Sequence, residues 1–419
     1  MRTLIKNLLE KPEVLFSFSV LLFGSLCAFA ADASSQDLSL HDAVQSALSK
    51  RPELQAAASM ETASAQLRRQ AGMIPNPRLF YQSENLRPNM DFGQNVDTYA
   101  YATESIETSG RRGARIAAAN ANVDRSRLAM EQQRRLIELR VAQAYWDALR
   151  YQYLRDLAEQ NVGYYREILD YHEKRFKEGK MAEMDLLRIK LEEARAEASA
   201  GSSRLAEAQA KQQLAREMGL TAPANWRLSE SFDVLNAPKE PSSPIDPQDQ
   251  RIEVQLARQA IEVARANLMV QKAQGRPDID TLFGYKRNAG NNTMIAGIQM
   301  NVPVLDRNQG NIGAARSDIE ANQSLLAAVQ QQGATDLALA RMAYDTWRRQ
   351  ITEHYRPLLD QATDIANISR AAYREGGVDL LRLLDAERLR IDTQSTWVES
   401  LGNYHQSVLS LEYAEGLEP

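Results

Sequence analysis

The residue types that most often perform chemistry are sparse in this chain and do not cluster. Each of the four histidines, His41, His172, His354 and His405, lacks a second metal ligand three or four positions further on. The single cysteine is Cys27. We find no glycine loop for phosphate, no nucleophilic-serine elbow and no zinc-binding helix motif. The sequence therefore indicates no catalytic centre, no bound cofactor and no resident metal site.

Charge is abundant but nearly balanced. The 419 residues include 50 lysines and arginines against 55 aspartates and glutamates, giving a formal net charge of −5. Because phosphate binding needs a basic face, nucleic acid is not a predicted partner. Most carboxylates alternate with basic residues in segments of helical pattern, which is typical of solvated helix faces carrying i,i+4 pairs.

The N-terminal segment has the pattern of an export signal. A basic start is followed by an apolar run over 14–29 and by the small-x-small sequence Ala28-Phe29-Ala30. We therefore expect a signal peptide over residues 1–30. A retained membrane anchor is less favoured, because the run is short for a bilayer span. Lipid attachment at Cys27 stays open, although Leu26 stands where that processing prefers a small residue.

The chain repeats itself. Arg51-Pro52-Glu53-Leu54-Gln55 recurs as Arg251-Ile252-Glu253-Val254-Gln255, and Phe176-Lys177-Glu178-Gly179 recurs as Tyr373-Arg374-Glu375-Gly376. The two offsets, 200 and 197 residues, are nearly equal, and repeats at nearly equal spacing indicate a duplicated supersecondary unit. The predicted parts are a first repeat over 31–219, a proline-rich linker over 220–248 and a second repeat over 249–416.

Both repeats predict the same order of elements, which makes the fold mainly α with two β-hairpins. Each begins with a helix, continues with period-two strands, and then enters a very long helical stretch. In the second opening helix the apolar residues recur every three or four positions. The first helix begins with a capping box at Ser39 and Asp42, and Pro357 predicts a kink in the second long helix. The expected ranges are helices 39–72 and 249–273, hairpins 78–107 and 278–304, and long helical pairs 114–218 and 314–414.

These elements are incomplete within one chain. Tyr99, Tyr101 and Thr103 share one strand face, whereas Met294 and Ile298 lie on an apolar face, as in tilted membrane strands. Four strands cannot close a barrel, which needs about eight, and open edges are not tolerated in lipid. The first long helix, at ~1.5 Å per residue, spans about 96 Å and carries an apolar seam. A homo-oligomer would complete both parts.

Three motifs in this order resemble the TolC-type outer-membrane factors over nearly the whole chain after the signal. They are the Ser109–Arg115 segment SGRRGAR, the Val302–Gly310 segment VPVLDRNQG, and Tyr373-x-x-Gly376 followed by the Leu380–Ala386 segment LLRLLDA. The resemblance implies a homotrimer with a 12-stranded β-barrel continuous with an α-helical barrel. It implies a passive exit duct in the outer membrane that extends into the periplasm. It also implies two partners, a periplasmic membrane-fusion adaptor and an inner-membrane RND-type pump.

A finer resemblance concerns the exported substrate. Gly284-Tyr285-Lys286-Arg287 and Asp306–Asn311 look like the CzcC-like branch, whose pumps export divalent heavy metals. Three alternatives stay open: a duct for drugs or other small molecules, a duct for type I protein secretion, and a periplasmic coiled-coil scaffold that forms no channel.

The resemblance also places candidate functional residues. Asp385 matches a family position where aspartates ring the narrow periplasmic end, while Arg382 stands where a second aspartate occurs in the best-known member. Three carboxylates around a narrow axis would attract cations. Alternatively, Asp385 pairs on the helix surface with Arg382 or Arg388. The helical turns are the second candidate, as adaptor contacts or as ordinary turns; their residues are Gly179, Lys180, Met181, Gly376, Gly377 and Val378.

Overall fold

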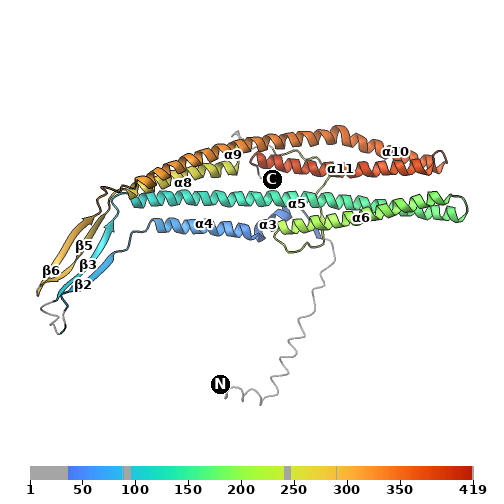
Figure 1. Ribbon diagram of the computed structural model, residues 1–419. Coiled ribbons are helices and arrows are strands. Elements are labelled where there is room, and N and C mark those ends of the chain that lie inside the picture. Colours follow the sequence, from blue (N-terminus) through green and yellow to red (C-terminus); the bar gives the residue numbers. More distant parts are fainter. Residues whose placement is uncertain (1–35, 87, 89–95, 240–246, 289, 418–419) are drawn as a thin grey trace, which may run out of the picture.

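The computed structural model shows an elongated molecule with a β-sheet at one end and long helices running away from it (Figure 1). It describes residues 36–86, 88, 96–239, 247–288 and 290–417. The expected signal peptide over 1–30, with Cys27, lies outside the described residues. Among the described residues, no helix is both long enough and apolar enough to cross a membrane.

The first half of the chain forms two opening helices, the two strands of a β-hairpin, a long helical hairpin, and two three-residue strands at its beginning and end. Its longest helix is an uninterrupted 67 residues, or about 100 Å at ~1.5 Å per residue. The elements are β1 (Gln36–Leu38), α3 (Leu40–Lys50), α4 (Pro52–Ala71), β2 (Arg78–Glu84), β3 (Asp97–Ile106), α5 (Arg111–Lys177), α6 (Glu183–Glu217) and β4 (Trp226–Leu228).

The second half repeats this order, but its long helix is interrupted. A π-helical segment, η1, separates α9 from α10 and ends at Tyr355, two residues before Pro357. The kink predicted at this proline is therefore present as a π turn. The elements are α7 (Pro247–Gln250), α8 (Ile252–Gln274), β5 (Ile279–Asn288), β6 (Asn291–Met300), α9 (Gln309–Arg349), η1 (Gln350–Tyr355), α10 (Arg356–Arg374) and α11 (Leu380–Ala414).

The single opening helix expected in each repeat is wrong. The first is broken at Arg51, whose φ and ψ of −71° and 123° are extended, because a residue before proline is driven out of the α region. The second is broken at Arg251, which has no proline after it. Both arginines are buried, and each is held by a carboxylate: Arg51 by Glu217 at 2.6 Å and Arg251 by Asp336 at 3.3 Å.

The two hairpins join into one antiparallel sheet in the order β2-β3-β5-β6. The central pairing between β3 and β5 connects the two repeats, with Tyr101 opposite Gly284. A Cβ atom at Gly284 would lie 2.3 Å from the Ala100 carbonyl oxygen, so the two strands approach closely only because this residue is glycine. Separately, β1 and β4 form a two-stranded parallel ribbon that the sequence did not predict.

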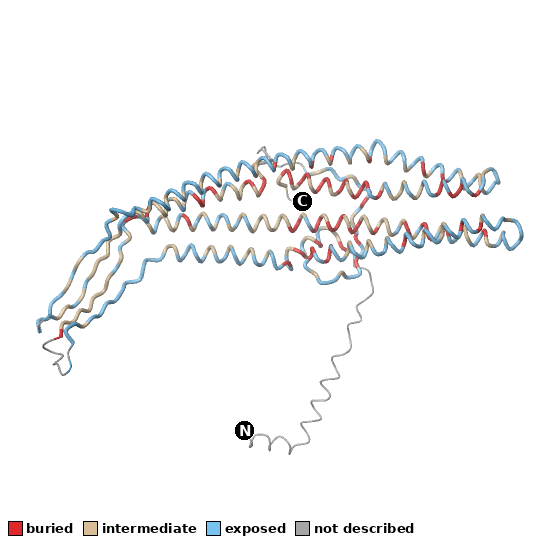
Figure 2. The backbone as a smooth tube through the Cα atoms, viewed as in Figure 1, coloured by how far each residue is buried: buried red, intermediate tan, exposed pale blue. Residues whose placement is uncertain are grey.

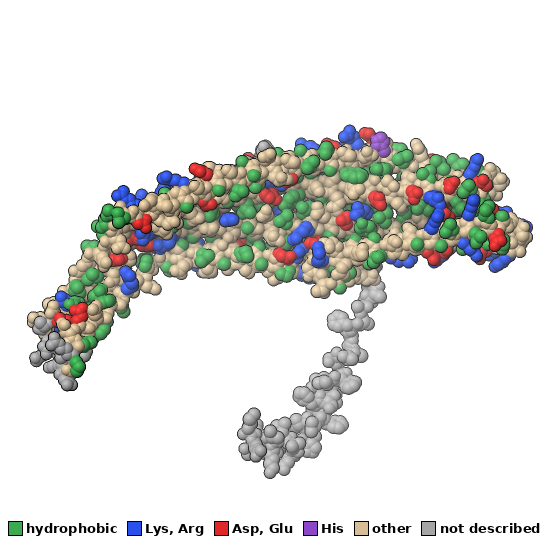
Figure 3. Space-filling view, viewed as in Figure 1, with side chains coloured by type: hydrophobic (Ala, Val, Ile, Leu, Met, Phe, Trp, Pro, Cys, Tyr) green, Lys and Arg blue, Asp and Glu red, His purple; other side chains and the backbone are tan. Residues whose placement is uncertain are grey.

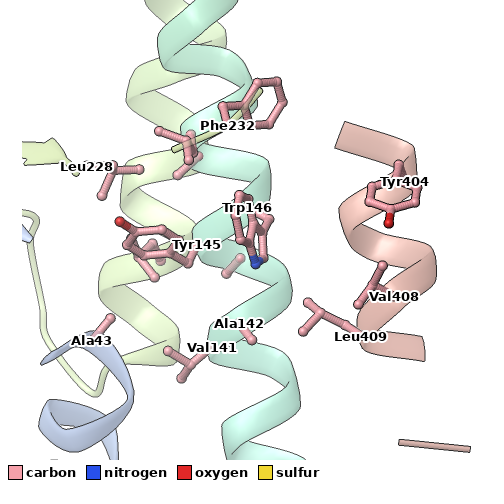
Figure 4. Close-up of a cluster of buried hydrophobic side chains, with 14 of the residues drawn as sticks. Ala43, Val141, Ala142, Tyr145, Trp146, Leu228, Phe232, Tyr404, Val408 and Leu409 are labelled. Carbon is pink, nitrogen blue, oxygen red and sulfur yellow. The ribbon is translucent and has the colours of Figure 1, made fainter. Parts of the chain in front are cut away.

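The main core lies midway along the helices, where the returning helices α6 and α11 and the chain after β4 meet α5 (Figures 2 and 4). Trp146 stacks on His405 with ring centroids 3.8 Å apart, and Phe232 packs beside both rings. The Tyr145 hydroxyl donates to the Leu38 carbonyl at 2.8 Å, so the β1 ribbon is fastened to α5. A smaller cluster lies near the helical turns.

Candidate functional site

The sheet has one apolar face, as the strand alternation predicted. Opposed residues on this face include Ala100, Tyr285 and Met294 on one row and Ile106, Ile279 and Met300 on another. Several of its side chains are strongly exposed: Leu79 is 86% exposed, Ile298 75% and Tyr81 70%. Monomeric soluble proteins rarely expose such a continuous apolar area, so this face is built to contact lipid or protein.

The opposite face of the sheet is more polar and carries side chains that interact across the strands. Arg78 lies 3.6 Å from Asp280, and the Lys286 ammonium lies over the Tyr99 ring at 5.2 Å. Phe80 stacks on Tyr101 with ring centroids 4.6 Å apart. A sheet with one apolar and one polar face separates two environments, which is the property that a channel wall requires.

Both outer strands leave an edge without a partner among the described residues, since β2 pairs only with β3 and β6 only with β5. An unpaired edge presents a row of N–H and C=O groups that lipid cannot satisfy. One chain therefore provides an incomplete wall.

Arginines join the sheet to the helices. Arg111 donates to the Gln274 and Arg276 carbonyls at 2.9 and 3.0 Å and pairs with Asp278 at 2.7 Å. Arg112 donates to the Gly72 carbonyl at 2.8 Å. These carbonyls lie at the C-terminal ends of α8 and α4, where helix dipoles favour a cation.

This explains the SGRRGAR motif in physical terms. Basic side chains in the first turn of α5 oppose the dipole of their own helix, but they satisfy the carbonyl ends of two neighbouring helices. Arg115 completes the set. Its Nη2 donates to the Glu107 carboxylate at 3.1 Å and to the Met73 carbonyl at 3.3 Å. The unfavourable placement of three arginines at a helix start was the sequence signal for this junction.

The two helical turns lie together at the end of the molecule far from the sheet (Figure 1). Gly179 and Gly376 both adopt left-handed φ angles, +70° and +75°. In each turn the next N–H bonds back into the helix, Lys180 to the Arg175 carbonyl at 2.9 Å and Gly377 to the Ala372 carbonyl at 2.8 Å. This is the closure by which a helix ends on glycine.

The apolar residues beside these glycines are only partly accessible to solvent. Met181 is half-buried and packs against the small cluster near the turns, and Val378 is also half-buried. Lys180 is exposed and pairs with Glu178 at 2.9 Å. The end of the molecule around the turns presents charged and apolar side chains together, and Met184 and Leu381 are among the exposed apolar residues there (Figure 3).

Asp385 and Arg382 are both exposed on α11, one turn apart. The alternative in which Asp385 pairs with a neighbouring arginine is not what the structure shows. Arg388 pairs instead with Glu192 at 2.6 Å, and the ion pairs of the described residues include none with Asp385 or Arg382. Asp379 caps the helix by accepting from the Arg382 N–H at 2.9 Å. Asp385 thus presents a carboxylate to solvent.

The sequence did not single out His172, which joins the two helical hairpins near their turns. Its Nδ1 lies 2.8 Å from the Ile168 carbonyl oxygen, which can only accept, so Nδ1 carries the proton. Its Nε2 then accepts from the Tyr373 hydroxyl at 2.7 Å. Burial lowers the pKa of the His172 imidazole, which favours this neutral form. Tyr373 belonged to a quoted motif, but its partner lies 201 residues away.

A buried carboxylate on α11 was also missed. Glu387 is fully buried and pairs with Arg370 of α10 and, at 2.8 Å, with Arg390. Arg390 in turn reaches the Asn161 side-chain oxygen on α5 at 3.4 Å. Glu387 therefore ties the second helical hairpin together and, through Arg390, links it to the first. Nothing in its sequence neighbourhood distinguishes it from the solvated glutamates.

A sheet with two unlike faces, continued by long helices that end in paired turns, is the geometry expected of a channel wall. Sequence comparison agrees: residues 43–220 and 248–417 match the outer membrane efflux protein family. The chain belongs to this family. It is an outer-membrane efflux channel that extends into the periplasm, which excludes the alternative of a scaffold that forms no channel.

The individual relatives share less than a third of their residues with this chain. The chain is 23% identical over 352 residues to the cobalt-zinc-cadmium resistance protein CzcC of Cupriavidus metallidurans, covering 82% of this chain and 81% of that protein. It is 27% identical over 350 residues to the nickel-cobalt-cadmium resistance protein NccC of Alcaligenes xylosoxydans xylosoxydans, covering 79% and 77%. A crystal structure of CusC superposes with a TM-score of 0.76 at 20% identity, covering 94% and 96%, which confirms the predicted fold.

Proposed function

We propose that three copies of this chain form a passive exit duct for divalent heavy-metal cations. The observation that carries the trimer is the incomplete wall: a four-stranded sheet with an exposed apolar face and two open edges. Three chains would bring twelve strands into one closed sheet, and the long helices would continue it into the periplasm. The two repeats, 31–219 and 249–416, would then alternate around the axis, with the segment 220–248 joining them.

The proposed cargo rests on the relatives. Both curated relatives are named for resistance to cobalt and cadmium, together with zinc or nickel. A duct for cations must attract them weakly enough to release them. The exposed, unpaired Asp385 meets this requirement, since three copies would place negative charge near the axis without a closed ligand set. Arg382 beside it would moderate that charge.

We further propose that the helical turns contact a periplasmic membrane-fusion adaptor, which links the duct to an inner-membrane RND-type pump. The contact residues would be Gly179, Lys180, Met181, Gly376, Gly377 and Val378. Support comes from their shared position at the end far from the sheet and from the exposed charge at Lys180. The pump supplies the energy, so the duct requires none.

Metal tolerance of a deletion strain tests the cargo. Loss of this chain should lower tolerance of zinc, cobalt, cadmium or nickel, and the wild-type gene should restore it. Asp385→Asn should restore it only in part, whereas Asp364→Asn, an exposed aspartate on α10, should restore it fully. The metal assignment would be contradicted if the strain tolerated every divalent metal as well as the wild type does. Lowered tolerance of drugs, or failed protein secretion, would then indicate which other cargo the duct exports.

A further inference from the structure

The loop over residues 301–308, which leads from β6 into α9 and is called the junction loop below, exposes apolar side chains at the end of the sheet (Figure 1). Leu305 is 90% exposed, the largest exposed fraction among the large apolar residues that the structure describes. Val302 and Val304 are 65% and 64% exposed. Three exposed apolar side chains within four positions mark a contact surface rather than scattered surface residues.

The polar side chains of the junction loop bond to its own backbone. The Asp306 carboxylate accepts from the Asn308 N–H at 2.8 Å. The Gln309 side chain accepts from the Arg307 N–H at 2.8 Å and donates to the Leu305 carbonyl at 3.3 Å. These bonds satisfy backbone groups without water, which is what a loop beside lipid requires, and they leave the apolar side chains to face outward.

The junction loop is also fastened to the C-terminal end of α8. The Asn308 side-chain amide donates to the Gln271 carbonyl at 2.8 Å. The loop backbone approaches Gly275 so closely that a Cβ atom there would lie 2.5 Å from the Arg307 carbonyl oxygen. The loop therefore has one fixed position relative to the helices, and Leu305 is exposed from a held backbone.

The corresponding loop of the first repeat is built differently. Gly110 before α5 and Asn308 before α9 both adopt left-handed φ angles, so they occupy equivalent positions. Three residues earlier, Glu107 stands in the first repeat and Leu305 in the second. The Glu107 side chain is only 11% exposed and pairs with Arg115. Duplication alone therefore does not account for the exposed Leu305.

The level of the junction loop follows from the sheet. Ile298 and Met300 lie on its apolar face and are 75% and 54% exposed. A tilted strand of ten residues, the length of β6, fits an apolar band about 25 Å tall. The helices beyond it extend into the periplasm. The loop that follows Met300 therefore lies where the acyl chains of the periplasmic leaflet meet the headgroups.

Cations accompany these apolar residues. Arg307 in the loop and Arg276 beside Gly275 are exposed, and the ion pairs of the described residues include neither of them. Nearby carboxylates are engaged elsewhere: Asp278 pairs with Arg111 at 2.7 Å, and Asp306 accepts from the loop backbone. Two guanidinium groups are therefore available to phosphate, which they bind well. Apolar side chains next to cations are typical of segments at a lipid interface.

We propose that the junction loop anchors the channel in the periplasmic leaflet of the outer membrane. Leu305, Val302 and Val304 enter the acyl chains at the leaflet boundary, while Arg307, with Arg276 beside it, binds phospholipid phosphate. The loop thereby fixes how deep the sheet sits in the membrane. This inference goes beyond the proposed function, because it requires neither a particular cargo nor an adaptor.

A fluorescent label at position 305 tests the apolar contact. Full-length protein carrying Cys27→Ser and Leu305→Cys is labelled with bimane and reconstituted as the intact oligomer into vesicles of phosphatidylethanolamine and phosphatidylglycerol. We expect quenching by phospholipid brominated on its acyl chains and protection from iodide. Leu325→Cys, on α9 and 60% exposed, is the matched control, and brominated phospholipid should not quench its label.

Retained phospholipid tests the charged contact. Native mass spectrometry of the detergent-solubilised oligomer measures its binding of added phosphatidylglycerol. Arg307→Ala should weaken binding about fivefold, the factor expected for one arginine at an anionic lipid surface. Arg276→Ala should weaken it less. Arg348→Ala, an exposed arginine near the far end of α9, is the control and should bind as the parent does.

Two results at position 305 would overturn the anchor. Quenching by iodide but not by brominated lipid would place the loop in water, and protection from both quenchers would mean that a second copy of the chain covers it. Equal binding by Arg307→Ala and Arg348→Ala would overturn the phosphate contact. Circular dichroism and the oligomer mass establish that each variant folds, and Val304→Cys provides the label site if Leu305→Cys does not.

Discussion

The two helical hairpins have the same order of elements but different construction. The first is led by α5, a continuous helix that buries aromatic and branched side chains between Ile137 and His172. The second is led by α9, η1 and α10, with a π turn and a proline, and α10 itself buries only Ala362 and Ala366. The second compensates with a buried ion cluster around Glu387. The two copies thus keep the same order of elements but are held in different ways, the first by buried apolar side chains along α5 and the second in part by buried charges.

The largest expected effect is at the seam where the repeats pair. Gly284→Ala would place a Cβ 2.3 Å from the Ala100 carbonyl oxygen and from the Tyr101 Cα, both backbone atoms that cannot yield. We expect loss of the β3–β5 pairing, costing more than about 4 kcal/mol. Gly297→Ala is the control, because its Cβ would meet only the Leu282 side chain, at 3.3 Å. The yield of folded protein from outer membranes measures the effect, and equal yields would contradict it.

The next effect compares ion pairs in the two hairpins. Glu387→Ala removes a fully buried carboxylate and leaves two guanidinium groups unpaired, which should cost about 3 kcal/mol of unfolding free energy. Glu197→Ala removes the exposed partner of Arg166 in the first hairpin and should change stability little. Denaturant unfolding of both variants distinguishes them. Similar losses would mean that the buried cluster is not what holds the second hairpin.

An intermediate effect follows from the buried arginine at the break between α3 and α4. The Arg51 side chain lowers the pKa of Glu53 to about 2 from 4.5. Burial opposes ionisation of Glu217, but hydrogen bonds and the charge of Arg51 outweigh it, so its pKa is also lowered. Carboxylates with lowered pKa values stabilise the fold above pH 4.5 and lose that contribution as the pH falls toward 2.

Arg51→Ala should therefore reduce stability at neutral pH and flatten the decrease in stability between about pH 4.5 and 2. Thermal unfolding across this range provides the measurement. A variant that retains the acid dependence of the parent would show that other carboxylates are responsible.

The smallest effect concerns the contact between the hairpins. Tyr373→Phe removes only the hydroxyl that donates to His172 and should cost about 1 kcal/mol. Because burial lowers the pKa of His172, the neutral ring is favoured in the fold, and its contribution is present above pH 6.5 and lost as the pH falls below it. His172→Phe should remove this pH dependence. Amide exchange near the turns at pH 7 and pH 5 measures it, and an unchanged difference would contradict the assignment.

The sequence predicted what depends on local periodicity. The strand alternation around Ala100 and Met294, the capping by Ser39 and the kink at Pro357 all follow from side chains close together in the chain. The break at Arg51 was missed, although Pro52 directly after it disfavours a helical conformation at this residue.

Features that depend on distant pairing could not be read in this way. The β3–β5 seam, the β1–β4 ribbon and the bond from Tyr373 to His172 join residues that no local pattern relates. The exposure of Asp385 also depends on a distant residue. Arg388, three positions further along the helix, could pair with Asp385, but it forms its ion pair with Glu192 of another helix. The proposed roles of Asp385 and of the turn residues therefore await experiment.

The most direct test is the mass of the detergent-solubilised protein, measured by sedimentation with the bound detergent subtracted, alongside its β-sheet signal in circular dichroism. If each chain supplies only part of the channel wall, the mass should equal three chains, and dissociation should abolish the strand signal. A single chain in detergent that retains its full strand content would contradict this account.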